Sequence, residues 1–413
     1  QELVLGVNAI WVSNPQPAPA GAWGGDCGAT YSGYHGFWPS DWQGIDAHLG
    51  SEADWTTFID AAHARNMRVV MDWVGNQVHE DHPITREWDE DAFNMRSICS
   101  EPDRYGTLGW DRIPESCWFA EYLPDLNQAQ PDVLVADIES AIQWAQDHDL
   151  DGLRVDAAKH MPHAVSWNLN SRVAQSLEHR AAGSDFEFYL VGETFDGQER
   201  INAYIGPDQL DGQFDFPLYW TLREALIYDS VSLADLVHTA GSLAERYPGG
   251  RMSTFLGNLD VGRFTTTAAE WTEEQCVEGE LRQAGTPTDT HAYDRLVLAW
   301  SLLFTQPGIP LIYYGDEMGL PGYNDPDNRQ PLWWAADVTA GEVSDVQTQL
   351  PGGPAWVLGT VAALAQARAD HPALATGQTT EWWAEPSDWP TLYAYARTQG
   401  DDAALVILSR WTD

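Results

Sequence analysis

Three acidic residues stand at or near the ends of apolar, β-rich runs. Asp156 closes the run GLRVD, Glu193 follows LVG, and Asp260 follows FLGNL. Cleavage of a glycosidic bond needs two carboxyl groups in different protonation states, one that attacks and one that protonates the leaving oxygen. Any one of these acids alone is best explained as an ordinary strand-end carboxylate that faces solvent. Three of them in similar positions favour hydrolytic chemistry.

Neighbouring residues suggest different tasks for two of these acids. Arg154 lies two residues before Asp156, so on a strand both side chains face the same way. We expect this cation to keep Asp156 ionised at neutral pH. Glu193 is flanked by apolar Val191 and Phe195, and a less polar pocket suits a general acid.

Short β-rich runs alternate with longer helical patterns, as repeated βα units around a parallel sheet do. The predicted strands are 7–13, 68–73, 152–156, 188–193, 212–216, 254–259 and 309–314. The predicted helices are 52–65, 132–147, 163–181, 232–246, 290–305 and 355–369. Ser51 and Asp54 form a predicted capping box for the first helix, and Val135, Ile138 and Ile142 lie on the predicted apolar face of the second. The pattern predicts an α/β fold, the TIM (β/α)8 barrel.

A closed barrel needs eight strands, and this set lacks one. We expect the missing strand to precede Gln1, which would make the chain a fragment or processed form without its first βα unit. A long segment rich in Trp, Pro and Gly follows the strand that ends at Trp73, and 390–413 alternates like strands. The predicted domains are barrel residues 1–76, an inserted domain B at 77–131, barrel residues 132–373 and a truncated C-terminal β-sandwich at 374–413.

Charge excludes one class of partner. The chain has 62 acidic and 21 basic residues, a formal net charge of −41, and Lys159 is its one lysine. Such a surface repels phosphate backbones, so we expect no nucleic-acid partner. A surface adapted to high salt and a GC-rich genome explain the lysine depletion equally well.

No run of 18 apolar residues occurs, so no membrane span is predicted.

The four cysteines are Cys27, Cys99, Cys117 and Cys276. Cys99 and Cys117 flank a polar stretch with Pro and Gly and form the predicted disulfide; four unpaired thiols remain the alternative. An even count fits an oxidising compartment, so we expect a secreted protein. We also expect a monomer.

Taken together, several motifs resemble those of the α-amylase family of glycoside hydrolases. The resemblance runs from about residue 5 to 335. It rests on DWVGN at 72–76, LPDLN at 123–127, GLRVDAAKH at 152–160, GETF at 192–195, NLD at 258–260 and GIPLIYYGDE at 308–317. These correspond to the first signature, a motif near the end of the inserted domain, the nucleophile motif, the acid/base motif, the third carboxylate and the eighth-strand motif.

The resemblance implies a role for each acidic residue. Asp156 would be the nucleophile, Glu193 the acid/base, and Asp260 the group that binds and distorts the sugar, with Arg154 orienting Asp156. It also implies retention of anomeric configuration, for which the two carboxyl groups lie ~5–5.5 Å apart.

Substrate-binding positions follow from the same resemblance. YHGFW at 34–38 resembles a segment that meets the sugar on the non-reducing side, and NDPDNR at 324–329 resembles a loop that grips a glucose further back. The implied binding residues are Tyr34, His35, Phe37, Trp38, Lys159, His160, Asp325 and Arg329. Each aromatic residue among them has core packing as its alternative explanation.

Two positions depart from the family pattern. Gln77 and Leu259 stand where the family has histidines that hydrogen-bond the sugar next to the cleaved bond. Gln77 can still donate through its amide, whereas the Leu259 side chain cannot hydrogen-bond. We therefore expect weakened or altered catalysis.

A hard-cation site is also implied, because members of the family hold Ca²⁺ between the barrel and the inserted domain through oxygen ligands. Asn76, Asp125 and the backbone carbonyl of His160 match those positions. Glu80 and Asp81 offer carboxylates nearby, with a solvated acidic loop as the simpler explanation.

The leading functional hypothesis is a retaining hydrolase of α-1,4-glucosidic bonds in starch or maltooligosaccharides. One alternative is a transglycosylase, or a relative acting on cyclodextrins or maltooligosaccharides, because water and a sugar acceptor compete for the same intermediate. Another is a catalytically weak glucan-binding protein on the same fold.

Overall fold

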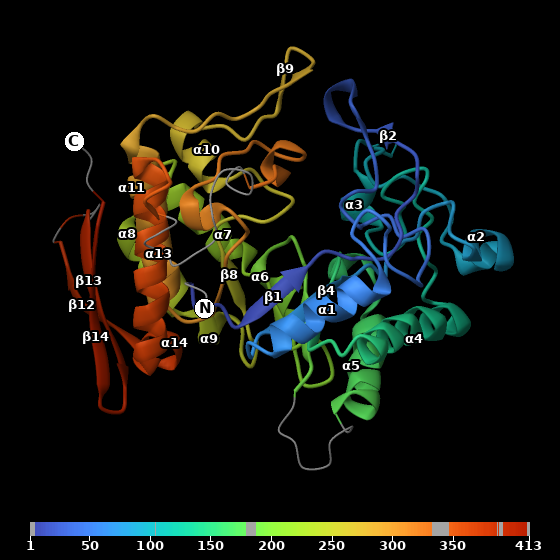
Figure 1. Cartoon of the computed structure of the whole chain (residues 1–413), viewed down its shortest axis with the longest axis horizontal. Helices are drawn as coiled ribbons and strands as arrows, with labels where there is room; N and C mark the ends of the chain where they lie inside the picture. The colour runs from blue at the N-terminus through green and yellow to red at the C-terminus, as the bar shows by residue number, and fades with distance from the viewer. Residues whose placement is uncertain are drawn as a thin grey trace. The chain divides into compact units, whose positions relative to one another are not determined.

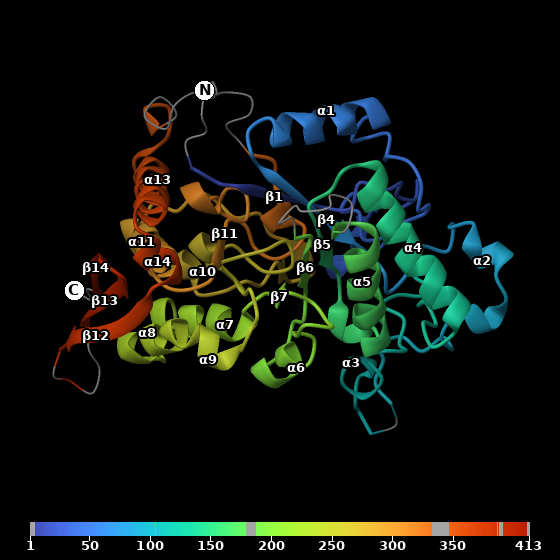
Figure 2. The ribbon, with the colours of Figure 1, turned by 90° about the horizontal axis from the view of Figure 1, so that it is seen from below.

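The computed structural model describes residues 5–103, 105–178, 187–332, 347–385, 387 and 391–410. These residues form two compact units. The N-terminal unit comprises residues 8–214, and the C-terminal unit comprises 5–7 with the described part of 215–410. Figures 1 and 2 show the chain from two directions.

A parallel sheet forms the centre of the N-terminal unit. Among the described residues it has five strands in the order β1-β4-β5-β6-β7, so strands that follow one another as βα units lie side by side. Their bounds are β1 Ala9–Val12, β4 Arg68–Trp73, β5 Gly152–Val155, β6 Tyr189–Gly192 and β7 Gly212–Gln213. Asp72 is in register with Arg154, and Arg154 with Val191. This register aligns the ends of three strands.

Helices cover this sheet. The helices of the unit are α1 Glu52–His63, α2 Ile84–Glu87, α3 Gly109–Arg112, α4 Pro131–Asp147, α5 His163–Ser176 and α6 Gln198–Asn202, with a short hairpin of β2 Trp23–Gly24 and β3 Thr30–Tyr31. Helices α4 and α5 pack side by side (Figure 2). The predicted capping box of Ser51 and Asp54 is confirmed.

One predicted core position on α4 is wrong. Val135 is 58% exposed, whereas Ile138, Ile142 and Ala145 are buried as expected. The buried face is centred near Ala141, and at ~100° per residue Val135 falls outside it.

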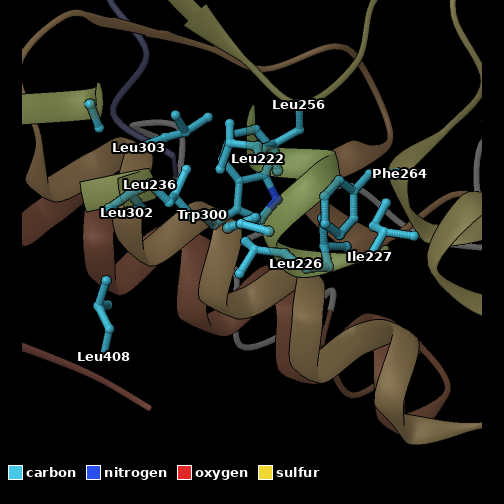
Figure 3. Packing of buried hydrophobic residues seen from close by; sticks show 14 of the residues in the cluster. Leu222, Leu226, Ile227, Leu236, Leu256, Phe264, Trp300, Leu302, Leu303 and Leu408 are labelled. Carbon is cyan, nitrogen blue, oxygen red and sulfur yellow. The ribbon is translucent and has the colours of Figure 1, made fainter. Parts of the chain in front are cut away.

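The C-terminal unit contains a second parallel pair, β8 Ser253–Phe255 with β11 Ile309–Leu311. Its helices are α7 Phe216–Leu226, α8 Leu233–Gly241, α9 Leu243–Arg246, α10 Phe264–Glu270, α11 Thr290–Thr305, α13 Gly352–Asp370 and α14 Pro372–Thr376. Its antiparallel strands are β9 Cys276–Val277, β10 Glu280–Leu281, β12 Gln378–Ala384, β13 Leu392–Gln399 and β14 Asp402–Ser409. Trp300 of α11 lies in a buried cluster with Leu222, Leu226 and Leu303 (Figure 3).

Each of the seven predicted strands is present; β4 has the predicted bounds, and the other six are shorter than predicted. The strand predicted at 254–259 ends at Phe255, so Asp260 lies in a loop several residues beyond β8. The alternating segment near the C-terminus does form antiparallel strands, because β12, β13 and β14 pair in one sheet (Figure 1). The end of the helix predicted at 163–181 falls partly outside the described residues.

The predicted disulfide between Cys99 and Cys117 is confirmed, with Cα atoms 5.0 Å apart. The alternative of four unpaired thiols is wrong, because Cys27 and Cys276 are disulfide-bonded as well.

Within the described ranges, no helix combines the length and apolar character needed to cross a bilayer.

Arg368 of α13 joins several segments of the C-terminal unit. Its Nη1 donates to the carbonyls of Phe304, Gln306 and Leu374 at 2.8–2.9 Å, and its Nη2 donates to that of Gly308 at 2.6 Å. Phe304 belongs to the last turn of α11, whose carbonyls have no partners within the helix. The cation also lies where it stabilises the helix dipole.

We expect Arg368→Met to lower the free energy of unfolding by about 2–3 kcal/mol, because it removes these charge-assisted bonds while keeping the aliphatic stem. Urea unfolding of the purified protein measures the change. The same substitution at exposed Arg65, which follows α1 and donates to Ala61 O, is the control and should change stability by less than about 0.5 kcal/mol. Equal effects of the two substitutions would contradict this role.

Candidate active site

The guanidinium of Arg154 is the centre of the site in the N-terminal unit. Its Nη1 lies 2.9 Å from Asp72 Oδ1 and 2.6 Å from Asp156 Oδ1, and its Nη2 lies 2.8 Å from Glu193 Oε2. Arg154 is 1% exposed and Asp72 is fully buried. The two predicted catalytic carboxylates of this unit therefore share one cation with a third carboxylate.

Burial and Arg154 have opposite effects on the pKa of the carboxyl groups of Asp156 and Asp72. The pKa of Asp156 is raised to about 7, chiefly by burial and also by the nearby charges of Glu193 and Asp72, while the Arg154 charge lowers it. Burial likewise raises the pKa of Asp72 to about 7, against the opposing effect of Arg154. Arg154 lowers the pKa of Asp156, as its place two residues before that acid predicts, but burial and the charges of Glu193 and Asp72 act in the opposite direction.

Aromatic rings surround the buried cation. The Arg154 guanidinium carbon lies 5.2 Å from the ring centroid of Trp11, 5.6 Å from that of Phe37 and 5.9 Å from that of Phe214. These rings exclude water from the cation and its carboxylates, so their electrostatic interactions are stronger than they would be in solvent.

Backbone bonds continue the sheet into both catalytic positions. Asp156 N–H donates to Trp73 O at 3.0 Å, and Glu193 N–H donates to Val155 O at 2.9 Å. Ala157, directly after Asp156, has a φ of 48°, a conformation that costs energy for a residue with a side chain. This turn redirects the chain immediately after Asp156.

Lys159 links the two loops that carry these acids. Its Nζ donates to Phe195 O at 2.7 Å and lies 3.7 Å from Asp196 Oδ2. His160 points toward the inserted segment, where its Nδ1 lies 2.8 Å from Pro114 O. Burial lowers the pKa of His160 to about 4, so the neutral ring donates from Nδ1 to this carbonyl.

The predicted binding segment 34–38 forms an aromatic cluster. His35 Nδ1 accepts from Phe37 N–H at 3.0 Å, and the His35 ring lies 4.7 Å from Trp38 and 5.3 Å from Tyr34. Tyr34 is 52% exposed. Trp38 is half-buried and packs edge-on against Trp23 and Tyr122, two supporting rings that motif comparison did not single out.

Gln77 is directed at the backbone of this cluster. Its Nε2 donates to Phe37 O at 3.2 Å, and its Oε1 has no hydrogen-bond partner among the described residues. The Nε2 of Gln77, with which it could replace a histidine, therefore donates to Phe37 O. The other polar atom of the side chain, Oε1, can only accept a hydrogen bond.

Asp260 belongs to the C-terminal unit, where it lies with the other predicted residues of that unit. Arg329 Nη2 lies 3.3 Å from Asp260 Oδ1, and Arg329 Nε lies 3.1 Å from Asp325 Oδ1 and donates to Leu259 O at 2.9 Å. The Asp260 side chain is 45% exposed, and Leu259 is buried. The structure therefore collects the predicted site residues into two groups, one in each unit.

A buried carboxylate lies at the predicted cation site. Asp125 is 1% exposed and accepts from Asn76 Nδ2 at 2.8 Å and from Asn94 Nδ2 at 2.7 Å. Burial raises the pKa of Asp125 well above its usual range. In the described part of the chain, no basic side chain pairs with it. Carboxylate and amide oxygens are the ligands that Ca²⁺ prefers, so this donor set fits a hard cation.

Other kinds of metal site receive no support. Within the described ranges, no group of three or more His, Cys, Asp or Glu side chains is placed to hold an ion.

Asn94 lies far from Asn76 and Asp125 in the sequence, which explains why motif comparison did not identify it. Asp72 did carry a signal, since a single acid inside the apolar run VVMDW is unusual.

Comparison with known proteins gives matches to α-amylases and to related glucan-acting enzymes. The family model described as the alpha amylase catalytic domain matches residues 3–374. An α-amylase of Streptomyces lividans is 28% identical over 95% of this chain and 47% of its own length. A cyclomaltodextrin glucanotransferase of Paenibacillus macerans is 27% identical over 98% of this chain and 52% of its own length. The chain thus spans about half the length of these curated relatives.

Solved structures share the fold. The α-amylase of Geobacillus thermoleovorans, crystallised with acarbose, superposes with a TM-score of 0.74 at 26% identity, covering 98% of this chain and 77% of that one. The cyclic α-maltosyl-(1→6)-maltose hydrolase of Arthrobacter globiformis superposes with a TM-score of 0.72 at 21% identity over 98% of this chain and 79% of that one. The α/β fold is that of α-amylases. With a family match over most of its length, this chain belongs to the α-amylase family of glycoside hydrolases.

Proposed function

We propose that this protein hydrolyses α-1,4-glucosidic bonds of starch or maltooligosaccharides with retention of configuration. The observation that carries the proposal is the shared contact of Asp156 and Glu193 with one guanidinium, through Nη1 and Nη2 of Arg154. Two carboxyl groups held by one planar cation lie close together, which supports the retaining separation of ~5–5.5 Å over the wider inverting one. The α-glucan substrate is supported by the relatives, one of which was crystallised with acarbose.

In the proposed mechanism, Asp156 attacks the anomeric carbon while Glu193 protonates the departing glycosidic oxygen. A glycosyl ester forms on Asp156, and Glu193 then takes a proton from the water that cleaves it. Arg154 lowers the pKa of Asp156 against the effect of burial and so favours the ionised nucleophile. Asp260 would bind and distort the sugar.

Transfer to a sugar acceptor is a second candidate reaction. The cyclomaltodextrin glucanotransferase of Paenibacillus macerans is nearly as similar to this chain as the α-amylase of Streptomyces lividans. Both reactions pass through the same glycosyl-enzyme, so the identity of the acceptor decides between them. Incubation with one maltooligosaccharide distinguishes them, since transfer yields products longer than the starting sugar.

The finer architecture that we propose follows the family. Residues 77–131 would form an inserted domain, 374–413 a C-terminal β domain, and the parallel strands would belong to a (β/α)8 barrel. The Cys99–Cys117 disulfide within the inserted segment supports an oxidising, extracellular location. The net charge of −41 supports function at raised salt.

We further propose that Asn76, Asn94 and Asp125 hold a structural Ca²⁺, with the carbonyl of His160 as a further ligand. Bound there, the ion would supply positive charge to the buried Asp125 carboxylate. This would join the end of β4 to the inserted segment and stabilise the surroundings of the site.

We expect Glu193→Gln to lower the rate of reducing-sugar release from soluble starch by about 10²–10⁴-fold, because the amide cannot protonate the leaving oxygen. The assay compares the full-length protein with the variant at low and high salt. Glu199→Gln, at an exposed position on the following helix, is the matched control and should keep full activity. A folded parent that releases no sugar would favour the glucan-binding alternative.

Gln77 and Leu259 differ from the family pattern, and introducing histidine at both positions tests whether this difference weakens catalysis. We expect the double variant Gln77→His, Leu259→His to raise kcat/KM on maltooligosaccharides about tenfold to a hundredfold, since a hydrogen bond made in the transition state is worth ~1–3 kcal/mol. Leu259→Met keeps the volume without a polar atom and should give no gain. An unchanged rate in the double variant would show that these positions do not limit turnover.

Thermal unfolding with Ca²⁺ and with a chelator tests the cation site. A saturating ion at ~100 times its Kd stabilises the folded protein by about 2.7 kcal/mol, so Ca²⁺ should raise Tm of the parent. Asp125→Asn should abolish this rise because it removes the ligand charge. Asp91→Asn, on an exposed neighbouring position, should retain it. A rise that survives in the Asp125 variant would place the ion elsewhere.

A further inference from the structure

The loop that carries Asp260 is held by a buried side chain from a distant segment. Asn328 is fully buried, and its Nδ2 donates to Leu259 O and Val261 O at 2.9 Å each. These two carbonyls belong to the residues on either side of Asp260. A third and longer contact of 3.5 Å reaches Asn258 O.

The chemistry of these contacts defines the orientation of the amide. Carbonyl oxygens only accept, so the group that faces Leu259 O and Val261 O must be the NH₂ of Asn328. Its Oδ1 has no hydrogen-bond partner among the described residues. Asn328 therefore acts here purely as a donor to the Asp260 loop.

Asn328 is itself fixed from the opposite side. Arg263 is fully buried, and its Nε donates to Asn328 O at 2.9 Å while its Nη1 contacts Tyr314 O at 2.6 Å and Asp316 Oδ1 at 2.8 Å. A Cβ on Gly322 would lie 2.6 Å from the Asn328 Cα, so glycine permits this close approach. Hydrogen bonds thus connect the segment after β11 to the backbone around Asp260.

The Asp260 carboxylate is partly exposed and is contacted by Arg329. Its side chain is 45% exposed, its Oδ1 lies 3.3 Å from Arg329 Nη2, and its backbone N–H donates to Asn258 Oδ1 at 2.8 Å. Asp260 lies in a loop beyond β8, whereas Asp156 and Glu193 bond through their N–H groups to neighbouring strands. Its placement depends on side chains that hold the carbonyls next to it.

We propose that Asn328 is a positioning residue for the reaction, which sets the location of the Asp260 carboxylate by binding the backbone carbonyls on both sides of it. The inference rests on the proposed function of Asp260. Displacement of a reacting or binding group by about 1 Å can cost a hundredfold in rate, so loss of this donor should affect turnover although Asn328 does not touch the sugar.

The experiment is a double-mutant cycle between positions 328 and 260 in the full-length protein. Asn328→Ala should lower kcat on maltooligosaccharides tenfold to a hundredfold and change KM less than threefold. In the Asp260→Asn background the same change should lower kcat less than twofold, because there is no carboxylate left to position. Asn328→Ser, which keeps a donor, should fall between Asn328→Ala and the parent. Equal losses in both backgrounds would overturn the proposal.

A control variant and a second measurement separate this proposal from general destabilisation and from the proposed function. Gln330→Ala removes an amide of the same loop that donates to Asp327, and should leave kcat within twofold of the parent. A crystal structure of Asn328→Ala, or of Asn328→Ser if the alanine variant does not fold, should show the Asp260 loop displaced. An unmoved loop overturns the proposal, whereas a parent without activity overturns only the proposed function and leaves the crystal structure to decide the role of Asn328.

Discussion

The contact of one buried guanidinium with three carboxylates is the constraint on which the N-terminal unit depends. Arg154 pairs with Asp72, Asp156 and Glu193 from three adjacent strands or strand ends, among rings that exclude water. An unpaired charge in such a place costs several kcal/mol, so the strands must keep the register that brings these groups together. Burial then raises the pKa of Asp72 and of Asp156, while Arg154 lowers both.

The predicted catalytic groups are held in two physically different ways. Asp156 and Glu193 follow directly from parallel strands, and their N–H groups bond to the neighbouring strands. Asp260 stands in a loop and depends on amide and guanidinium side chains, Asn328 and Arg329, that bind the carbonyls beside it. Backbone support makes the first pair insensitive to most side chains nearby, whereas the third carboxylate depends on individual ones.

Polar contacts join the inserted segment to the parallel sheet, in addition to a buried apolar cluster of Val78, Ile84, Ala92, Leu126 and Val133. Asp125 accepts from Asn76, which follows β4, and from Asn94 within the segment, while His160 bonds to Pro114. The disulfide of Cys99 and Cys117 restrains the same segment covalently. Among the described residues, the donors to the buried Asp125 carboxylate are neutral amides, so a hard cation bound there would add the missing positive charge.

Local patterns in the sequence were sufficient for the seven strands, the capping box at Ser51 and the position of Asp156 and Glu193 directly after strands. Strand and helix periodicity depend on residues only a few positions apart. Strand ends are less predictable: the strand predicted to end at Leu259 ends at Phe255, so Asp260 lies in a loop and not directly after a strand. Only the tertiary structure brought Asp72 to Arg154, Asn94 to Asp125 and Asn328 to the Asp260 loop, since these partners lie at least 31 positions apart. Burial, too, is a property of the folded chain. It raised the pKa of Asp156, which its neighbour Arg154 alone would have lowered.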